Sequence, residues 1–392
     1  MEKVADKKVL FVLNRASLGG STSSLVNLLS LYKNQGIVFD VFLMAHDGAR
    51  TSDIAQYANL LPEDTVLSSC IKSKDRLKGL GQYAHRIKFI LCHKMFGYEK
   101  TIKKVYQDAA KTLSGRYETV IAYQENEATR FVQYIEARNR ITWMHTDFEL
   151  FYKNSENKDA FRELYSKYDH IVCVTKSSEE SVKSLLNRSN GTVHCIRNTL
   201  PTSAIREKSK YAIPEAEQRK KHFMFISVGR FSHEKAFERI PEVSKILIDR
   251  GHDFEWVVLG DGSTYDDVKK RVEVLGVTNH VRLLGSKQNP YPYINAADCL
   301  VITSRYEAQP MVANEALILD TPVISTEYAS AKEVITNYEN GLIVSQSAED
   351  IAEALSNFMN NKVLRDTLKN GAFDFVYSNE NEIKLLNNLI ER

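Results

Sequence analysis

A strand-length apolar run followed by a polar loop and a helical segment is the feature that most constrains the fold of this chain. Residues 299–303 (CLVIT) are apolar and largely β-branched, and they lead into the mostly polar residues 304–310. Pro310 suits the first turn of a helix, because the N–H groups there have no partner within the helix and proline lacks an N–H. A helix is therefore expected from about Met311 to a break at residues 320–322. Strand, loop and helix in this order build α/β sheets. Such sheets bind ligands at the carboxyl ends of their strands, where a helix N-terminus favours phosphate.

Similar strand-length runs recur in two series, which together predict an α/β chain of two domains. The chain has 392 residues, enough for two domains of ordinary size. The polar and charged residues 200–221, which include two prolines, are the expected linker. Strands are predicted at residues 8–14, 39–45, 64–67, 117–123, 140–147, 170–175 and 192–198, and then at 222–229, 254–262, 281–285, 299–303 and 341–344. Helices are predicted at residues 23–33, 177–186, 348–360, 362–375 and 380–392.

Two glutamates occupy the loop and helix that follow residues 299–303. Glu307 is expected in the loop, and Glu315 about two turns into the helix. Their spacing on one helix would rotate them by roughly 80° from each other. They are therefore interpreted as two separate contacts rather than as a pair that shares a proton. The residues alone also allow an exposed loop carboxylate and a solvated helix carboxylate.

Arg230 and Lys235 follow the strand predicted at residues 222–229 and are the candidate ligands of a diphosphate. An arginine offers forked donors and a lysine a point charge, and together they can stabilise a leaving nucleoside diphosphate. Two exposed cations in a turn are the ordinary alternative.

Gly19 and Gly20 lie between the strand predicted at residues 8–14 and the helix predicted at residues 23–33. Glycines at such a turn let a ligand approach the backbone closely. The residues alone favour a plain tight turn, since they form neither a GxGxxG fingerprint nor a Walker loop.

His145 and Asp147 lie at the carboxyl end of the strand predicted at residues 140–147. A lone histidine is usually structural or exposed. This one is expected at the edge of the sheet where α/β proteins bind ligands, which makes it a candidate site residue.

The stretch 304–315, continued by residues 321–326, resembles the retaining glycosyltransferases of the GT-B fold, family GT4, which carry Glu-x7-Glu at this strand–helix junction. Gly229, Arg230 and Lys235 match that family's Gly-Arg…Lys-Gly element, with Ala236 in place of the last glycine. The resemblance implies an α/β fold of two Rossmann-like, doubly wound domains that face a central cleft. These domains would be residues 1–205 (acceptor) and 206–375 (nucleotide-sugar donor), with a C-terminal helix near 376–392 that crosses back to the N-terminal domain.

The resemblance also implies roles for the candidate residues. Glu307 would lie over the donor sugar, and Glu315 would accept hydrogen bonds from the nucleotide ribose. His145 would face the donor sugar or its phosphate, with Asp147 near the acceptor, so that the expected catalytic residues are Glu307, His145 and Asp147. The expected donor-binding residues are Gly19, Gly20, Arg230, Lys235, Gln309, Met311, Val312 and Glu315.

One departure from the family pattern falls inside this site. Residues 308–310 are Ala-Gln-Pro where the family usually has Gly-Phe-Gly or Gly-Phe-Pro. The change would alter the backbone around the donor sugar. It therefore leaves the identity of the sugar undetermined and affects the expected reaction less.

The expected function is retaining transfer of a sugar from a nucleotide-sugar, taken to be a UDP-sugar, to a growing surface glycan or other polymer. Residues 143–147 resemble a motif of bacterial surface-polysaccharide enzymes, which implies an acceptor linked to a polyprenyl diphosphate. The chain has no Asp-x-Asp, so no metal and no cofactor are expected. The alternatives are a catalytically silent nucleotide-sugar-binding subunit and a GT-B nucleotide-sugar epimerase.

Residues 71–111 combine many cations with aromatic and aliphatic side chains, although the whole chain has a net charge of only +2. A basic amphipathic stretch can lie on an anionic membrane leaflet. A pair of solvated helices whose apolar faces pack on the domain is the alternative, and no nucleic-acid-binding module is recognisable. The sequence shows no signal peptide, no apolar stretch of membrane-spanning length and no paired cysteine motif. The expected location is therefore cytoplasmic, peripheral at the inner face of the plasma membrane.

Overall fold

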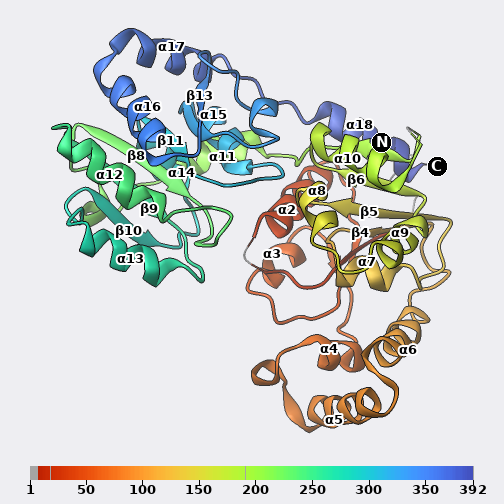
Figure 1. Ribbon diagram of the computed structural model, residues 1–392. Coiled ribbons are helices and arrows are strands. Elements are labelled where there is room, and N and C mark those ends of the chain that lie inside the picture. Colours follow the sequence, from red (N-terminus) through yellow and green to blue (C-terminus); the bar gives the residue numbers. More distant parts are fainter. Residues whose placement is uncertain (1–7, 18, 190, 392) are drawn as a thin grey trace. The chain divides into compact units, whose positions relative to one another are not determined.

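The computed structural model describes residues 8–17, 19–189 and 191–391, and its contacts divide the chain into two compact units (Figure 1). The first unit comprises Met1–Thr199 together with Asn379–Arg392, and the second comprises Leu200–Ser378. Each unit contains one sheet of parallel strands with helices packed on it.

The sheet of the first unit has the strand order β3-β2-β1-β4-β5-β6-β7. All neighbouring strands are parallel, and the chain reverses its direction of winding between β1 and β4. Such a reversal is where a doubly wound sheet offers a ligand site. The strands are β1 Val9–Leu13, β2 Asp40–Leu43, β3 Asn59–Leu60, β4 Thr119–Ala122, β5 Asn139–Met144, β6 His170–Cys173 and β7 Val193–Cys195.

The helices of the first unit include a group, α4 to α6, inserted between β3 and β4 (orange in Figure 1). This group corresponds closely to the basic stretch 71–111. The helices are α2 Gly20–Lys33, α3 Thr51–Ala55, α4 Thr65–Ile71, α5 Gly79–Phe96, α6 Tyr98–Ala110, α7 Glu127–Val132, α8 Phe148–Lys153, α9 Lys158–Ser166 and α10 Lys176–Leu186, with a 3₁₀ turn η1 at Lys74–Arg76.

The strand predicted at residues 64–67 is wrong, because these residues begin helix α4. The side chain of Asp64 accepts a hydrogen bond from the backbone N–H of Leu67 at 2.9 Å, which caps the helix. The third strand is instead the two-residue β3 at Asn59–Leu60. An aspartate before a short apolar run is a helix-start signal, and here it outweighs the β-branched Thr65 and Val66.

The sheet of the second unit has the strand order β10-β9-β8-β11-β12-β13, again with parallel neighbours. The direction of winding reverses between β8 and β11. The strands are β8 Phe223–Val228, β9 Phe254–Leu259, β10 Val281–Gly285, β11 Cys299–Ile302, β12 Val323–Thr326 and β13 Gly341–Val344. The core on one side of this sheet is built around Phe225, Trp256 and Val301, all of which are buried.

The segment 200–221, expected as a linker, contains helix α11 Thr202–Ser209, which belongs to the second unit. Ile205 on this helix is buried in the core beside Leu317 and Leu319. Arg206 on the same helix forms an ion pair with Asp320 at 3.1 Å, so apolar and charged contacts together dock α11 on the second unit. The other helices of the second unit are α12 Arg239–Asp249, α13 Tyr265–Val274, α14 Tyr291–Ala296, α15 Met311–Ile318, α16 Ala348–Asn360 and α17 Lys362–Phe373, with 3₁₀ turns η2 Glu215–Glu217 and η3 Ala331–Glu333.

The C-terminal helix α18, Glu380–Ile390, returns to the first unit as predicted. The amide of Asn139 donates to the carbonyl of Leu389 at 2.7 Å, and the Tyr32 hydroxyl donates to Oδ1 of Asn387 at 2.5 Å. Leu386 and Leu389 are buried. The helix is therefore part of the first unit's core, although about 180 residues of the second unit separate it from the rest.

Candidate functional site

Two glycines shape the turn that carries Arg230. Gly260 has φ +143°, and a Cβ there would lie 1.8 Å from the carbonyl oxygen of Gly229. Gly262 has φ +156°, and its Cβ would lie 2.3 Å from the carbonyl oxygen of Phe231. The turn after β9 therefore lies directly against the turn after β8. Any side chain at either glycine would displace the backbone around Arg230.

Lys235 and Glu307 meet at the carboxyl edge of this sheet, although they are far apart in the sequence. The Lys235 ammonium lies 2.5 Å from Oε1 of Glu307, and the Ser304 hydroxyl donates to the same oxygen at 2.6 Å. The two side chains are 20% and 11% exposed. The hydroxyl of Thr303 donates to the backbone carbonyl of Lys235 at 2.9 Å. The ends of β8 and β11 are thereby tied together, and a cation and a carboxylate occupy one small volume.

Glu315 lies on α15, which begins at Met311 directly after Pro310, as predicted. The Tyr291 hydroxyl on α14 donates to Oε1 of Glu315 at 3.2 Å. Burial raises the pKa of Glu315 to about 7, and the hydrogen bond from Tyr291 acts in the opposite direction. Hydroxyl donors stabilise the charged form of a buried carboxyl group and so lower its pKa. Sequence reasoning did not identify Tyr291, which carries no local motif.

The remaining donor-site candidates surround these groups. Arg230 is exposed, while Gln309, Met311 and Val312 are partly buried. Within residues 8–17, 19–189 and 191–391, no cluster of three or more His, Cys, Asp or Glu side chains is arranged to hold a metal ion, so no metal-ligand set can be named.

Ala236 occupies the position where the resembled family has a glycine, and it adopts the left-handed backbone region with φ +52°. It is completely buried. The backbone conformation that glycine would adopt without cost is thus retained, and alanine adopts it with some strain. The turn between Arg230 and α12 therefore keeps its shape despite the substitution.

In the first unit, His145 lies at the carboxyl end of β5 between two aromatic rings. Its ring is nearly parallel to that of Trp143, with centroids 6.3 Å apart, and lies 4.7 Å from the ring centroid of Tyr123. Burial lowers the pKa of His145 to about 3, so the imidazole is neutral at physiological pH. Its Nε2 is buried and has no hydrogen-bond partner among the described residues. A neutral imidazole with an unused nitrogen can exchange a hydrogen bond with a substrate hydroxyl.

Glu125 supports the loop that carries His145. Its Oε1 accepts a hydrogen bond from the backbone N–H of Thr146 at 2.8 Å and another from the backbone N–H of His145. The amide of Asn14 donates to the backbone carbonyl of Glu125 at 3.3 Å. Burial raises the pKa of the Glu125 carboxyl. Glu125 was not among the residues predicted from the sequence. One signal could have identified it: Glu125 follows the strand that pairs with the strand before His145, so the two residues were expected at the same edge of the sheet.

Asp147 caps helix α8, because its Oδ1 accepts from the backbone N–H of Leu150 at 3.1 Å. This contact explains the residue structurally, and its proximity to an acceptor stays a prediction. Gly20 begins α2 and a Cβ there would meet open space, while Gly19 precedes it with an extended backbone of φ 170°. The fold thus does not require glycine at position 20. Leu18, in the same expected turn, lies outside the described residues.

Comparison with known proteins finds a family match within the second unit. Residues 209–375 match the family described as Glycosyl transferases group 1. The lipopolysaccharide core biosynthesis glycosyltransferase LpsE of Rhizobium meliloti is 32% identical over 144 residues, which is 36% of this chain and 41% of LpsE. The chain matches only 42%, 62% and 41% of the lengths of three curated relatives.

Solved structures resemble the whole chain. The crystal structure of TarM superposes with a TM-score of 0.75 at 13% identity and covers 100% of both chains. That of Anabaena HepE in complex with UDP-glucose superposes with a TM-score of 0.70 at 17% identity, covering 97% of this chain and 99% of HepE. These likenesses, with the two parallel sheets, confirm the GT-B fold.

Proposed function

We propose that this chain transfers a sugar from a nucleotide-sugar to a growing surface glycan. Its residues 209–375 match the glycosyl transferases group 1 family, which confirms the resemblance. One observation carries the proposal. Lys235 and Glu307 are in contact at the carboxyl edge of β8 and β11, and Glu315, with its pKa near 7, lies on the helix that follows β11. A cation for a diphosphate and two separate carboxylates for hydroxyl groups are what a nucleotide-sugar site needs.

In this proposal, Arg230 and Lys235 bind the donor diphosphate. Lys235 exchanges the Glu307 carboxylate for phosphate oxygens, which releases Glu307 to accept from hydroxyls of the donor sugar. Glu315 accepts from the ribose hydroxyls. HepE was solved with UDP-glucose, which supports a UDP-sugar donor. The two cations stabilise the charge of the donor diphosphate, as a bound metal does in transferases with an Asp-x-Asp motif, so no essential metal or cofactor is proposed.

The chemical step breaks the bond between the anomeric carbon and the diphosphate oxygen, and an acceptor hydroxyl oxygen forms the new bond to that carbon. The acceptor proton passes to the leaving phosphate oxygen, so atoms and charge balance. Retention of the anomeric configuration is proposed from the family resemblance. Arg230 and Lys235 stabilise the negative charge that develops on the leaving diphosphate.

The first unit is proposed to bind the acceptor. Neutral His145 would exchange a hydrogen bond with a sugar or phosphate oxygen, held in place by Glu125 through the backbone of residues 145 and 146. Asp147 would lie near the acceptor in addition to capping α8. The name of LpsE supports a surface polysaccharide as product, and a polyprenyl diphosphate is the proposed lipid carrier.

Helix α5 is proposed to contact an anionic membrane leaflet at the cytoplasmic face. Its buried residues are Gln82 and Phe89, while apolar side chains at helical spacing on another face are exposed, together with Lys88 and Lys94. The alternative is a pair of solvated helices whose apolar faces pack on the domain, as Phe89 of α5 and Ile102 of α6 do. No helix within the described part of the chain is long and apolar enough to cross a bilayer. The exposed apolar residues of α5 are Leu80, Tyr83, Ile87, Ile90, Leu91, Met95 and Phe96.

Calorimetric titration with UDP, GDP and ADP, without metal, tests the donor site. The wild type is expected to bind one of them, and Glu315→Ala is expected to lose that binding. Absence of binding to all three, with or without magnesium, would sink the proposal. Release of the nucleotide from a nucleotide-sugar in the presence of acceptor then separates a transferase from a silent binding subunit. An epimerase would instead convert the nucleotide-sugar without any acceptor.

A further inference from the structure

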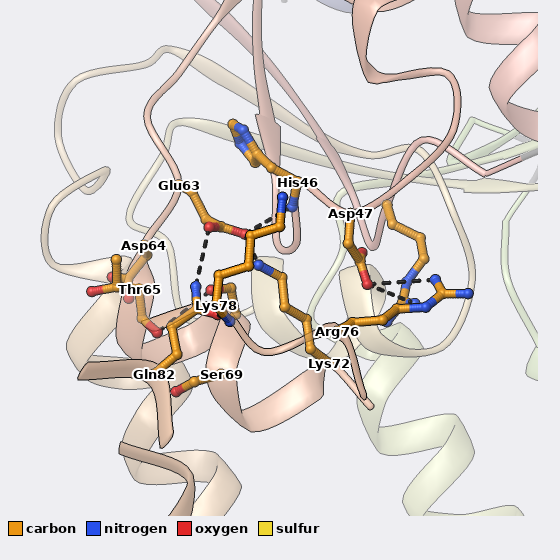
Figure 2. Close-up of polar contacts among 12 residues, drawn as sticks. His46, Asp47, Glu63, Asp64, Thr65, Ser69, Lys72, Arg76, Lys78 and Gln82 are labelled. Atoms are coloured by element: carbon orange, nitrogen blue, oxygen red, sulfur yellow. Dashed lines mark hydrogen bonds and ion pairs between the residues drawn. The ribbon is translucent and has the colours of Figure 1, made fainter. Parts of the chain in front are cut away.

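A cluster of charged side chains in the first unit lies outside the residues used so far (Figure 2). Arg15 follows β1, Asp47 follows β2 and Glu63 follows β3. These three strands are parallel neighbours, so their carboxyl ends share one edge of the sheet. Lys72 and Arg76 reach the same place from the chain after α4 and from η1. The cluster therefore lies where α/β sheets bind ligands.

The half of the cluster around Glu63 is saturated with contacts. The Lys72 ammonium lies 2.6 Å from Oε1 of Glu63 and is only 3% exposed. The same oxygen accepts from the backbone N–H of His46 at 2.9 Å, and Oε2 accepts from the Gln82 amide at 3.4 Å. The Gln82 carbonyl in turn accepts from the backbone N–H of Lys78 at 2.8 Å. This half fastens the inserted helices to the sheet and has little capacity for a ligand.

The half around Asp47 is different. Nη1 of Arg15 and Nη1 of Arg76 approach the same oxygen, Oδ2 of Asp47, at 3.4 and 3.5 Å. Asp47 is 8% exposed, whereas Arg15 and Arg76 are 28% and 49% exposed. Nη2 of Arg15 also donates to the backbone carbonyl of Ile71 at 3.3 Å. A guanidinium group has five N–H donors. Two guanidinium groups that share one carboxylate at long range therefore keep most of their donors and a net positive charge.

We propose that Arg15 and Arg76 form a binding site for a phosphate group of the acceptor. Two forked cations and one carboxylate leave a net positive charge, which suits a phosphate anion better than a neutral sugar hydroxyl. The inference deepens the proposed function and rests on it, because it names the class of acceptor. The phosphate belongs either to a phosphodiester in the glycan or to the diphosphate of a lipid carrier, and both offer the same oxygens.

The test is calorimetry on the full chain with UDP at saturating concentration, so that the donor site is occupied. The probes are a short poly(glycerol phosphate), which carries phosphodiesters, and farnesyl diphosphate, which carries a prenyl diphosphate. Arg15→Gln and Arg76→Gln should each weaken binding by about tenfold or more, because each removes a charge-assisted contact. Asp47→Asn should tighten binding, because it removes the competing carboxylate. Arg130→Gln is the matched control, since Arg130 is also 28% exposed and ion-paired in the first unit.

The probe that binds identifies the source of the phosphate. The proposal is overturned if neither probe binds the wild type, if Arg15→Gln and Arg76→Gln bind as the wild type does, or if Arg130→Gln loses as much. The melting temperature of each variant shows whether it is folded, and the half-exposed Arg76 provides the safer substitution if Arg15→Gln does not fold. Titration of UDP alone is scored separately, so a failed donor site is distinguished from a failed phosphate site.

Discussion

The carboxyl edges of the two sheets occupy equivalent positions in similar folds, but their charged groups are held in different ways. In the second unit, Lys235 and Glu307 are in direct contact at 2.5 Å, with Ser304 on the same carboxylate oxygen. In the first unit, Arg15 and Arg76 approach Asp47 only at 3.4 and 3.5 Å. In the proposed function a ligand displaces the short Lys235–Glu307 pair, whereas the long contacts of Arg15 and Arg76 leave donors that a ligand can use directly. The two proposals thus assign different kinds of anion site to sheets of similar topology.

The largest effect is expected from removing the cation of the short pair. Lys235→Ala should lower the turnover of sugar transfer by about 10²- to 10³-fold, because the leaving diphosphate loses a charged donor. The measurement is nucleotide release in the presence of acceptor. Lys245→Ala is the control, since Lys245 forms a single exposed ion pair on α12. Equal turnover in Lys235→Ala and the wild type would contradict the proposed role of Lys235 in the donor site.

A second effect concerns the exposed apolar side chains of α5 in the first unit. The double variant Ile87→Glu, Leu91→Glu should weaken binding to vesicles containing anionic lipid by about 100-fold, because each of the two apolar side chains contributes about 1.5 kcal/mol when buried. Sedimentation with vesicles measures it. Val363→Glu, at a similarly exposed position on α17 of the second unit, is the control and should bind as the wild type does. Unchanged binding of the double variant would contradict a role for α5.

A third prediction uses the pKa of Glu315, which burial raises to about 7. In the proposed donor site the ribose hydroxyls donate to the charged carboxylate of Glu315, so protonation below pH 7 competes with the nucleotide. UDP affinity should therefore rise as the pH is raised through 7, approaching tenfold per pH unit well below that value. Calorimetry at pH 5.5 to 8.5 measures it, within the range in which the protein stays folded. In Glu315→Gln this dependence should disappear, and if it persists, another group is responsible.

A fourth prediction concerns Glu125, whose carboxylate supports the loop that carries His145. Glu125→Ala should lower the free energy of unfolding by about 2 to 3 kcal/mol, because it leaves two backbone N–H groups without their acceptor. Glu125→Gln, which keeps an acceptor oxygen, should cost less. Urea unfolding measures both variants. Equal losses in the two would indicate that the hydrogen bonds are not what Glu125 contributes.

The smallest effect is expected at Ala236, whose φ is +52°. Ala236→Gly should change the free energy of unfolding by no more than about 1 kcal/mol, in the stabilising direction, because relief of the left-handed strain exceeds the added flexibility of the unfolded chain. Urea unfolding checks the sign. A clear destabilisation would mean that the buried methyl group contributes more through packing than its backbone costs.

Periodic features were predictable from the sequence. The run at residues 299–303 and the proline after it placed β11 and the start of α15 at Met311. Two errors came from segments with weak patterns. Residues 64–67 are a capped helix rather than a strand, and residues 200–221 hold α11 rather than only a linker. In both cases a few side-chain contacts decided the structure, an N-cap in the first segment and a buried apolar side chain with an ion pair in the second.

The sequence by itself determined the two α/β units and the helix that starts at Met311, because these depend on short-range periodicity and on local caps. The candidate donor-site residues came from the family resemblance and stay a prediction. Only the tertiary structure decided which distant side chains meet. It placed Lys235 against Glu307, Tyr291 on Glu315, Glu125 beneath His145 and two arginines on Asp47. It also decided that one face of α5 stays exposed. The physical reason is that sheet order brings strand ends together regardless of their separation in the chain, and no local pattern encodes that order.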